Sequence, residues 1–174
     1  MFRAPQIWFL AILTTLYGLS SSAGVVLPVV IPNIEQNFVV YLTGYSSAPS
    51  ATQVSHPIVH RNAGGTGTFS DPITLAVGHD VRSGQNILDF PAGTRFYIRN
   101  LRKYAIVEDT CTDGSCHSGY QGAPWLDIYI GGKDASQQCA NRLRDFQTII
   151  MTPKSGYPVI VGALGETGCK VFGR

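Results

Sequence analysis

Two aspartates with aromatic neighbours are the residues of this sequence best suited to chemistry. Asp127 lies between Trp125 and Tyr129 in the alternation of the run WLDIYI, and Asp109 ends the run YAIVED. Alternate side chains of a strand share a face, so Trp125, Asp127 and Tyr129 would lie together. Carbohydrate sites combine such groups, because an aromatic ring covers the apolar face of a sugar and a carboxylate bonds its hydroxyls or glycosidic oxygen. The plainer alternative is that the aromatics cover a hydrophobic shoulder while Asp127 caps a turn or pairs with an arginine.

Asp109 and Asp127 flank a loop that is rich in Cys, Gly and Ser. If this loop joins two adjacent strands, both carboxylates reach the same groove. Two carboxylates held close together cannot both ionise freely, so the pKa of one should rise. The group with the raised pKa can act as an acid at mildly acidic pH while the other stays charged.

Six short runs of β-branched and aromatic residues, bounded by Gly, Pro, Asn and Ser, indicate strands at 38–45, 73–78, 94–101, 104–109, 125–130 and 146–152. One segment, 133–145, has helical composition, with Ala135, Cys139 and Leu143 repeating every four residues. The chain is therefore expected to be mainly β, a small closed barrel with one short helix. The predicted buried core consists of Leu75, Phe96, Ile98, Val107, Leu126, Ile128, Ile130 and Ile149. Trp125 and Asp127 should reach solvent.

The N-terminus has the features of a signal peptide. An early cation precedes an apolar run from Ile7 to Leu16, and the small residues Ser21 and Ala23 lie where a signal peptidase cleaves. A membrane anchor continuing through 25–32 is the alternative, but serines, a glycine and a proline interrupt it, and a spanning helix needs about 20 mostly apolar residues. We expect a secreted, extracellular monomer without a stable membrane span. Its predicted parts are a signal peptide at 1–23, an extended segment at 24–37 and one barrel domain at 38–174.

Four cysteines, an even number in an exported chain, predict disulfides. Three pairings are possible, and the sequence does not choose among them. Cys111 with Cys116 would staple the loop, which leaves Cys139 with Cys169 to tie down the C-terminal tail. Zinc is disfavoured, because CTDGSC has no second cysteine pair and no histidine pair at zinc-finger spacing. We expect no metal and no cofactor.

The composition narrows the class of partner. The chain has 174 residues, 44% of them hydrophobic, and a formal charge of +2, which suits one globular domain with a proper core. Charged residues make up 14%, below the roughly 25% of typical soluble proteins. This balance gives no sign of a polyanion-binding surface and argues against nucleic acid as a partner.

Several runs, in order, resemble the three-aspartate (3D) domain of bacterial cell-wall proteins. They are LTGYSS, GGTGTFSDPITLAVG, FPAGTRFYI, YAIVEDTC and WLDIYIGG. The likeness spans about 38–152 and has several parts, so it is more specific than any single motif. It implies a six-stranded double-psi β-barrel, related to the catalytic barrel of membrane-bound lytic transglycosylase A and more distantly to expansins and small fungal endoglucanases.

The resemblance assigns roles to individual residues. Asp109 matches the second family aspartate, and Asp127 matches the third, which is the catalytic acid in the lytic transglycosylase. The resemblance thus implies that Asp127 is a general acid, and we expect Asp109 to be its base or positioning partner. The first is missing, because Gly78 stands at its position and Asp80 could replace it only if the turn shifts by two residues. The family's loop after the second aspartate is replaced by the longer CTDGSCHSGYQGAP. Along the groove we expect Tyr45, Tyr97, His117, Tyr120, Trp125 and Tyr129, although for His117 an exposed loop histidine is the plainer interpretation.

Two classes of function follow from these features. The first is an enzyme, a glycoside hydrolase or lytic transglycosylase, that cleaves glycosidic bonds of a cell-wall polysaccharide with an aspartate acid. The second is a non-catalytic, expansin-like module that binds carbohydrate or loosens the wall. A weaker third class is an inhibitor or effector that uses the barrel as a scaffold. The missing first aspartate favours binding, while the remaining pair and Trp125 favour catalysis.

Overall fold

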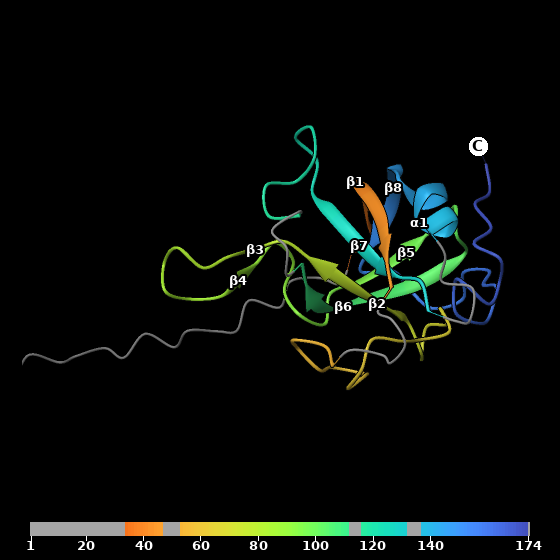
Figure 1. Ribbon diagram of the computed structural model, residues 1–174. Coiled ribbons are helices and arrows are strands. Elements are labelled where there is room, and N and C mark those ends of the chain that lie inside the picture. The colour runs from red at the N-terminus through yellow and green to blue at the C-terminus, as the bar shows by residue number, and fades with distance from the viewer. Residues whose placement is uncertain (1–33, 47–52, 112–115, 132–136, 174) are drawn as a thin grey trace, which may run out of the picture. The chain divides into compact units, whose positions relative to one another are not determined.

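The structure is a computed structural model that describes residues 34–46, 53–111, 116–131 and 137–173. The predicted signal peptide and most of the predicted extended segment lie outside the described residues. The described part forms a closed barrel of six strands with one short helix (Figure 1). The prediction of a mainly β fold with a small closed barrel is therefore confirmed.

Each barrel strand overlaps one of the six predicted runs. The strands are β1 (Gln36–Tyr45), β2 (Ile73–Val77), β5 (Arg95–Ile98), β6 (Lys103–Thr110), β7 (Trp125–Tyr129) and β8 (Asp145–Met151). They close in the order β1-β7-β2-β6-β5-β8. The pairs β1/β7 and β2/β6 are parallel, and the other neighbours are antiparallel.

Asp109 lies on β6 and Asp127 lies on β7. These two strands follow one another along the chain, but they are not neighbours in the barrel. After β6 the chain passes the end of β2, where the Cys111 N–H donates to the Val77 carbonyl at 3.0 Å. β2 therefore lies between β6 and β7, and its Ala76 is paired with Asp109 on one side and with Asp127 on the other. The expected adjacency of the two strands is wrong. Directly paired residues share a face, however, so both carboxylates still lie on the same side of the barrel wall, across a small residue.

The barrel interior is filled by alternate residues of the strands. All eight predicted core residues are buried, each with 1% or less of its surface exposed. On β7 the buried Leu126 and Ile128 alternate with the half-buried Trp125, Asp127 and Tyr129. A slip of one residue would have reversed these faces, so the predicted orientation of this strand is confirmed.

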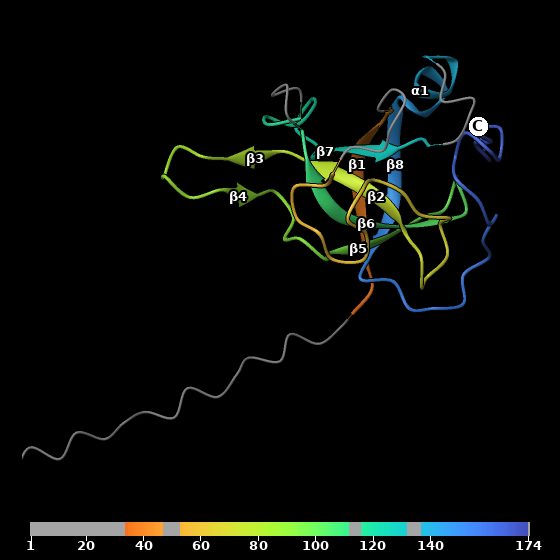
Figure 2. The same ribbon diagram turned by 60° about the horizontal axis from the view of Figure 1, so that its bottom comes forward.

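The helix α1 (Gln137–Leu143), seen at the upper right of Figure 2, contacts β1. Its buried residues are Cys139 and Leu143. Gly44 makes this approach possible, because a Cβ at that position would lie 2.6 Å from Leu143 Cδ1. The helix was predicted at 133–145, and the first part of that range lies outside the described residues. No helix in the described part of the chain is long and apolar enough to cross a membrane.

Two disulfides join Cys111 to Cys116 and Cys139 to Cys169. The structure thereby selects one of the three possible pairings. The second bridge spans 30 residues and ties α1 to the C-terminal segment. On the chain-entropy account a loop of that length stabilises the fold by about 3–4 kcal/mol.

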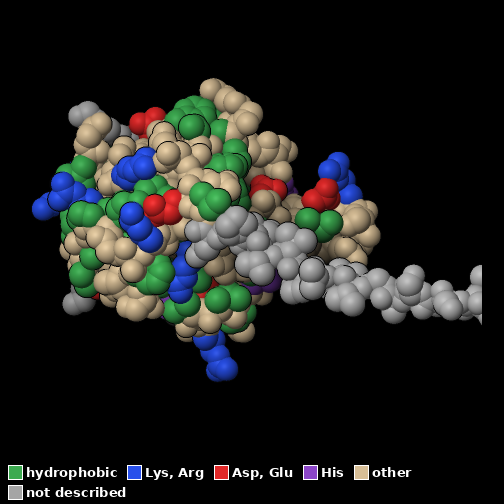
Figure 3. Space-filling view, turned by 180° about the vertical axis from the view of Figure 1, so that it is seen from behind, with side chains coloured by type: hydrophobic (Ala, Val, Ile, Leu, Met, Phe, Trp, Pro, Cys, Tyr) green, Lys and Arg blue, Asp and Glu red, His purple; other side chains and the backbone are tan. Residues whose placement is uncertain are grey.

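A small hairpin of β3 (His79–Asp80) and β4 (Ile87–Leu88) extends away from the barrel (Figures 1 and 2). Strands of two residues leave no detectable alternation, so the sequence did not predict them. On the face shown in Figure 3, the Lys and Arg side chains are separated by apolar and uncharged ones. The described residues visible there form no broad patch of one charge.

Candidate functional site

The outer wall of β1 and β7 carries two matched rows of side chains. In the parallel register Tyr41 pairs with Trp125, Thr43 with Asp127 and Tyr45 with Tyr129. Asp109 lies on the same face, beyond Ala76 of β2. We term this surface the aspartate face and define it by Thr43, Tyr45, Asp109, Trp125, Asp127 and Tyr129.

A short chain of hydrogen bonds orients Asp127. The Trp125 indole Nε1–H donates to Thr43 Oγ1 at 2.7 Å, and the Thr43 hydroxyl in turn donates to Asp127 Oδ1 at 2.7 Å. The indole has no other polar atom to offer, and a hydroxyl that accepts from it is left to donate onward. The carboxylate is thereby held in place while it stays half-exposed.

Asp109 is held by donors from three directions. Oδ1 accepts from the Ser55 N–H at 3.2 Å, the Ser55 hydroxyl at 3.1 Å and the Thr110 N–H at 2.9 Å, while Oδ2 accepts from the Tyr45 hydroxyl at 3.2 Å. Burial, followed by the charge and hydrogen bond of Asp109 and the charge of Asp127, raises the pKa of the Tyr45 hydroxyl. Tyr45 therefore remains a protonated donor close to both carboxylates.

An aromatic cluster adjoins Asp127. Tyr41 and Tyr120 are stacked with ring centroids 4.0 Å apart, and Trp125 meets Tyr41 edge-on at 5.3 Å. Phe146 lies 5.4 Å from Tyr41 and completes the cluster. Tyr120 and Phe146 remain exposed, so the cluster offers an apolar surface to a ligand beside the carboxylate.

Of the residues predicted to line the groove, Tyr45, Tyr120, Trp125 and Tyr129 gather at or beside the aspartate face, but Tyr97 does not. Tyr97 belongs to β5, where it pairs with Tyr104 of β6 and Ile150 of β8. Its hydroxyl donates to the Pro158 carbonyl at 2.6 Å, and its ring stacks on Tyr157 at 4.5 Å. Contrary to expectation, the structure buries Tyr97 in a separate tyrosine cluster, because β5 lies elsewhere in the barrel order.

His117 is exposed, as its plainer interpretation holds. Its Nε2–H donates to the Cys111 carbonyl at 2.9 Å, and its ring meets His79 edge-on at 4.4 Å. It lines a pocket together with Asp89. Within the described ranges, no three His, Cys, Asp or Glu side chains gather closely enough to hold a metal ion.

Neither Gly78 nor Asp80 supplies a further carboxylate to the aspartate face. A Cβ at Gly78 would lie 2.5 Å from Asp89 Oδ2 and 2.6 Å from the Cys116 carbonyl oxygen, so the position has no room for a side chain. Asp80 lies on the projecting hairpin, where Arg82 Nη2 donates to it at 2.6 Å. The hydrogen bonds from Arg82 lower the pKa of Asp80 to about 2, so this carboxylate is committed to its arginine.

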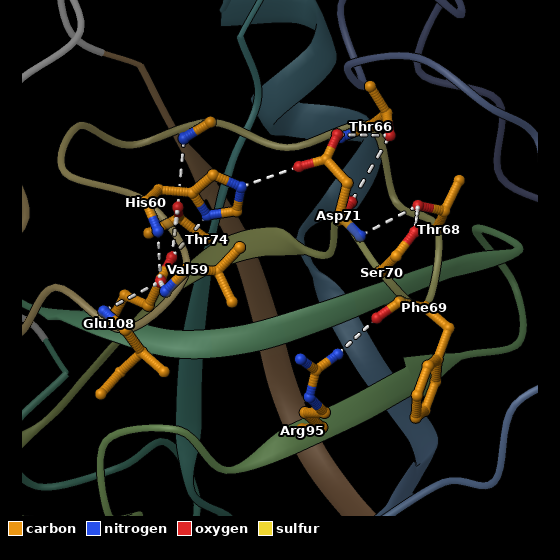
Figure 4. Close-up of polar contacts among 12 residues, drawn as sticks. Val59, His60, Thr66, Thr68, Phe69, Ser70, Asp71, Thr74, Arg95 and Glu108 are labelled. Atoms are coloured by element: carbon orange, nitrogen blue, oxygen red, sulfur yellow. Dashed lines mark hydrogen bonds and ion pairs between the residues drawn. The ribbon is translucent and has the colours of Figure 1, made fainter.

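A buried glutamate next to the site was not anticipated from the sequence. Glu108 is 0% exposed, and its Oε1 accepts from the backbone N–H groups of Ile58, Val59 and His60 (Figure 4). Its Oε2 receives the Thr74 hydroxyl at 3.1 Å and bonds His60 Nδ1 at 2.7 Å. Burial of a carboxylate is tolerated only with such full hydrogen bonding.

The bonds of His60 continue to a second carboxylate. His60 Nε2 lies 2.8 Å from Asp71 Oδ1, and Asp71 Oδ2 accepts from the Thr66 N–H at 3.0 Å and the Thr66 hydroxyl at 2.7 Å (Figure 4). Burial alone would lower the pKa of His60, but the hydrogen bonds to Asp71 and Glu108 outweigh it and raise that pKa. We term Glu108, His60 and Asp71 the clamp, because they bind the segment between β1 and β2 to the barrel wall.

Sequence reasoning missed two residues that hold the aspartates. Thr43 could have been found, since the alternation in VVYLTGY places it on the same face as Tyr45. Ser55 could not, because it lies in an irregular segment that no periodicity relates to Asp109.

Comparisons with known proteins identify a family profile and a curated relative. The profile of a family described as "DDB_G0273701 N-terminal domain" matches residues 35–170, which include the whole barrel and the aspartate face. "Uncharacterized protein DDB_G0273701/DDB_G0273221" of Dictyostelium discoideum is 31% identical over 134 residues, which cover 74% of this chain and 56% of that relative. The chain thus spans about half the length of the relative. No solved structure matches it significantly. On the extent of the profile match, the chain belongs to the DDB_G0273701 N-terminal domain family.

Proposed function

We propose that this chain is a secreted, polysaccharide-active protein that cleaves glycosidic bonds in a cell-wall polymer with Asp127 as the acid. The position of Asp127 carries the proposal. It is a half-exposed carboxylate between Trp125 and Tyr129, oriented by Thr43 and adjoined by exposed aromatic rings. Apolar ring surfaces beside a carboxylate are what a sugar chain requires of its site.

We further propose that the barrel is of the double-psi class found in 3D domains. Two observations support this assignment. The strands follow the order of the motifs along the sequence, and Asp109 and Asp127 share one face of the wall. The two disulfides fit export to an oxidising compartment, which supports secretion.

The arrangement favours chemistry with one acid. Asp127 would protonate the glycosidic oxygen as its bond to the anomeric carbon breaks. A water or a hydroxyl of the substrate itself would then attack the anomeric carbon, and the Asp127 carboxylate, having given up its proton, would accept the proton that this nucleophile loses. The oxygens of Asp109 accept hydrogen bonds from Ser55, Thr110 and Tyr45. In this scheme Asp109 therefore serves, with Tyr45, to position substrate and not as a nucleophile.

The second candidate is a non-catalytic module that binds carbohydrate or loosens a wall. One observation favours it. The oxygens of Asp109 already accept hydrogen bonds from Ser55, Thr110 and Tyr45, which leaves this carboxylate little capacity to act as a base. A binding module would use the same aromatic cluster and Asp127 only as a hydrogen-bond acceptor.

The test combines cleavage with binding on a panel of insoluble wall polysaccharides. New reducing ends or anhydro products are detected by mass spectrometry, and bound protein is measured by pull-down. Asp127→Asn should lower product release by a factor on the order of 10² to 10⁴ and leave binding nearly intact. Trp125→Ala should weaken binding instead.

Asp80→Asn is the matched control, because it removes an equal charge from the hairpin and should leave both readouts unchanged. If Asp127→Asn releases product at the wild-type rate, Asp127 is not the acid. If the wild-type protein binds a polymer without cutting it, the binding module takes precedence.

A further inference from the structure

A pocket outside the aspartate face has the features of a ligand site. Its volume is about 430 Å³, and its lining includes Phe38, Asp89, Phe90, His117, Gly119 and Gly122. This volume lies within the range of small-molecule sites. Phe38 meets Phe90 edge-on at 5.5 Å, and Phe90 packs in the same way on the buried Phe96 at 5.2 Å. The aromatic wall is thus anchored in the barrel core.

Asp89 brings a carboxylate to this pocket without a bonded partner. Among the described residues, no donor forms a hydrogen bond or ion pair with its side chain, and its titratable neighbours His117, His79 and Asp80 act on it only at a distance. Asp89 is an exposed residue at the rim of the pocket, and partial burial of its carboxyl group raises its pKa. Gly78 leaves the space for it, since a Cβ there would come within 2.5 Å of Asp89 Oδ2.

His117 adds a second acceptor. Its Nε2–H is used in the bond to the Cys111 carbonyl, which leaves Nδ1 of the neutral ring as an acceptor. The pocket therefore combines acceptors, one of them charged, with two phenyl rings. Its complement is a ligand that carries a positive charge and hydrogen-bond donors on a ring with an apolar face.

We propose that this pocket binds an amine-bearing sugar unit, a hexosamine whose amino group is free. The ammonium group bonds the Asp89 carboxylate, and the apolar face of the sugar ring packs against Phe38 or Phe90. The sugar part of this inference rests on the proposed function, and the site uses neither Asp109 nor Asp127. It deepens that function by naming a polymer that contains free amino groups.

One loop joins the pocket to the aspartate face. Gly119 and Gly122 line the pocket, while Tyr120 between them stacks on Tyr41 of the aromatic cluster. The same loop leads through Pro124, also a lining residue, into Trp125. A chain of sugars anchored in the pocket would therefore continue over this loop towards Asp127.

Calorimetry at physiological ionic strength tests the inference with three soluble hexamers: glucosamine with free amines, N-acetylglucosamine and glucose. We expect the wild-type protein to bind the free-amine hexamer most tightly. Asp89→Asn should weaken that binding roughly tenfold or more, because a charge-assisted hydrogen bond is lost, and should change the affinity for the other two hexamers less than about twofold.

Asp80→Asn is the control for charge alone. Its carboxylate is paired with Arg82, so the affinity for the free-amine hexamer should change less than about twofold. NMR shifts of the Gly119 and Gly122 amides, recorded while the free-amine hexamer is added to Asp89→Asn, report whether the variant still has the pocket. Equal binding of the three hexamers by the wild-type protein, or an unchanged affinity of Asp89→Asn, would overturn the inference. Failure of the proposed function appears separately, as unchanged product release in Asp127→Asn.

Discussion

Glu108 and Asp109 are consecutive acidic residues of β6, yet they stand in opposite surroundings. Glu108 is fully buried, and backbone and side-chain donors occupy both its oxygens. Asp109 is half-buried on the aspartate face, where Tyr45 bonds it next to Asp127. The comparison shows that the chain separates a carboxylate buried beneath the segment before β2 from a carboxylate that stays half-exposed on the aspartate face.

A β-bulge explains how neighbours along a strand can differ in this way. Leu75 of β2 pairs with Val107, but the next residue, Ala76, pairs with Asp109, so Glu108 is left out of the register. An extra residue bends a strand and re-aims its side chains. The side chains of Glu108 and Asp109 can therefore both point away from the barrel interior, whereas strict alternation would turn one of them into it. Glu108 is buried on the outside of the barrel wall, where residues 58–60 cover it.

Removal of the clamp carboxylate should have the largest effect on stability. Glu108→Ala leaves the backbone N–H groups of residues 58–60, the buried Thr74 hydroxyl and Nδ1 of His60 without their acceptor. We expect a loss of about 3–5 kcal/mol in the free energy of unfolding, measured by urea denaturation.

Asp109→Ala is the matched control, since it removes the adjacent carboxylate. It should cost less than half as much, because Asp109 is half-buried and water can replace it as an acceptor. Equal losses in the two variants would show that the contrast between Glu108 and Asp109 is not real.

The clamp should also set the pH range of greatest stability. The pKa of His60 is raised above its ordinary 6.5, so the folded state holds a proton that the unfolded state has lost, and stability falls as the pH rises past 6.5. Burial opposes ionisation of Glu108, but the hydrogen bonds from His60 and Val59 outweigh it and lower the pKa of Glu108 below 4.5, so stability also falls as the pH drops through that range. Urea unfolding should show maximal stability between about pH 4.5 and 6.5.

In His60→Gln the free energy of unfolding should fall less steeply above pH 6.5, because the variant lacks the imidazole whose proton binding stabilises the folded state. The variant would still offer an amide to Glu108, so it should fold. An unchanged slope between pH 6.5 and 8 in this variant would assign the decline to other groups.

Much of the fold could be predicted from the sequence, because burial imposes a visible pattern. On β7, apolar residues that alternate with Trp125 and Asp127 predicted which face of the strand is buried. The positions of the six barrel strands followed from β-branched and aromatic runs bounded by turn residues. The barrel order could not be read in the same way. Alternation does not say which strands are neighbours, so β2 between β6 and β7 was missed.

The residues of the candidate site also differ in whether a local sequence pattern predicts them. Asp127, Trp125 and Tyr129 share a strand, and period two brings them together. Asp109 needed the resemblance to a family, and Ser55 and His60 meet their partners through long-range contacts that leave no local pattern. Tyr97 was misplaced because an aromatic residue in a strand predicts burial or binding equally well.

Unfolding of Asp127→Asn by urea tests the central claim most directly, with Glu108→Gln measured beside it. If Asp127 serves a ligand and not the fold, its replacement by a residue that still accepts from Thr43 should change the free energy of unfolding by less than about 1 kcal/mol. Glu108→Gln should lose about 3 kcal/mol, because a neutral amide cannot match the charged acceptor of the clamp. A loss in Asp127→Asn as large as that in Glu108→Gln would show that Asp127 is a structural carboxylate and would contradict the account.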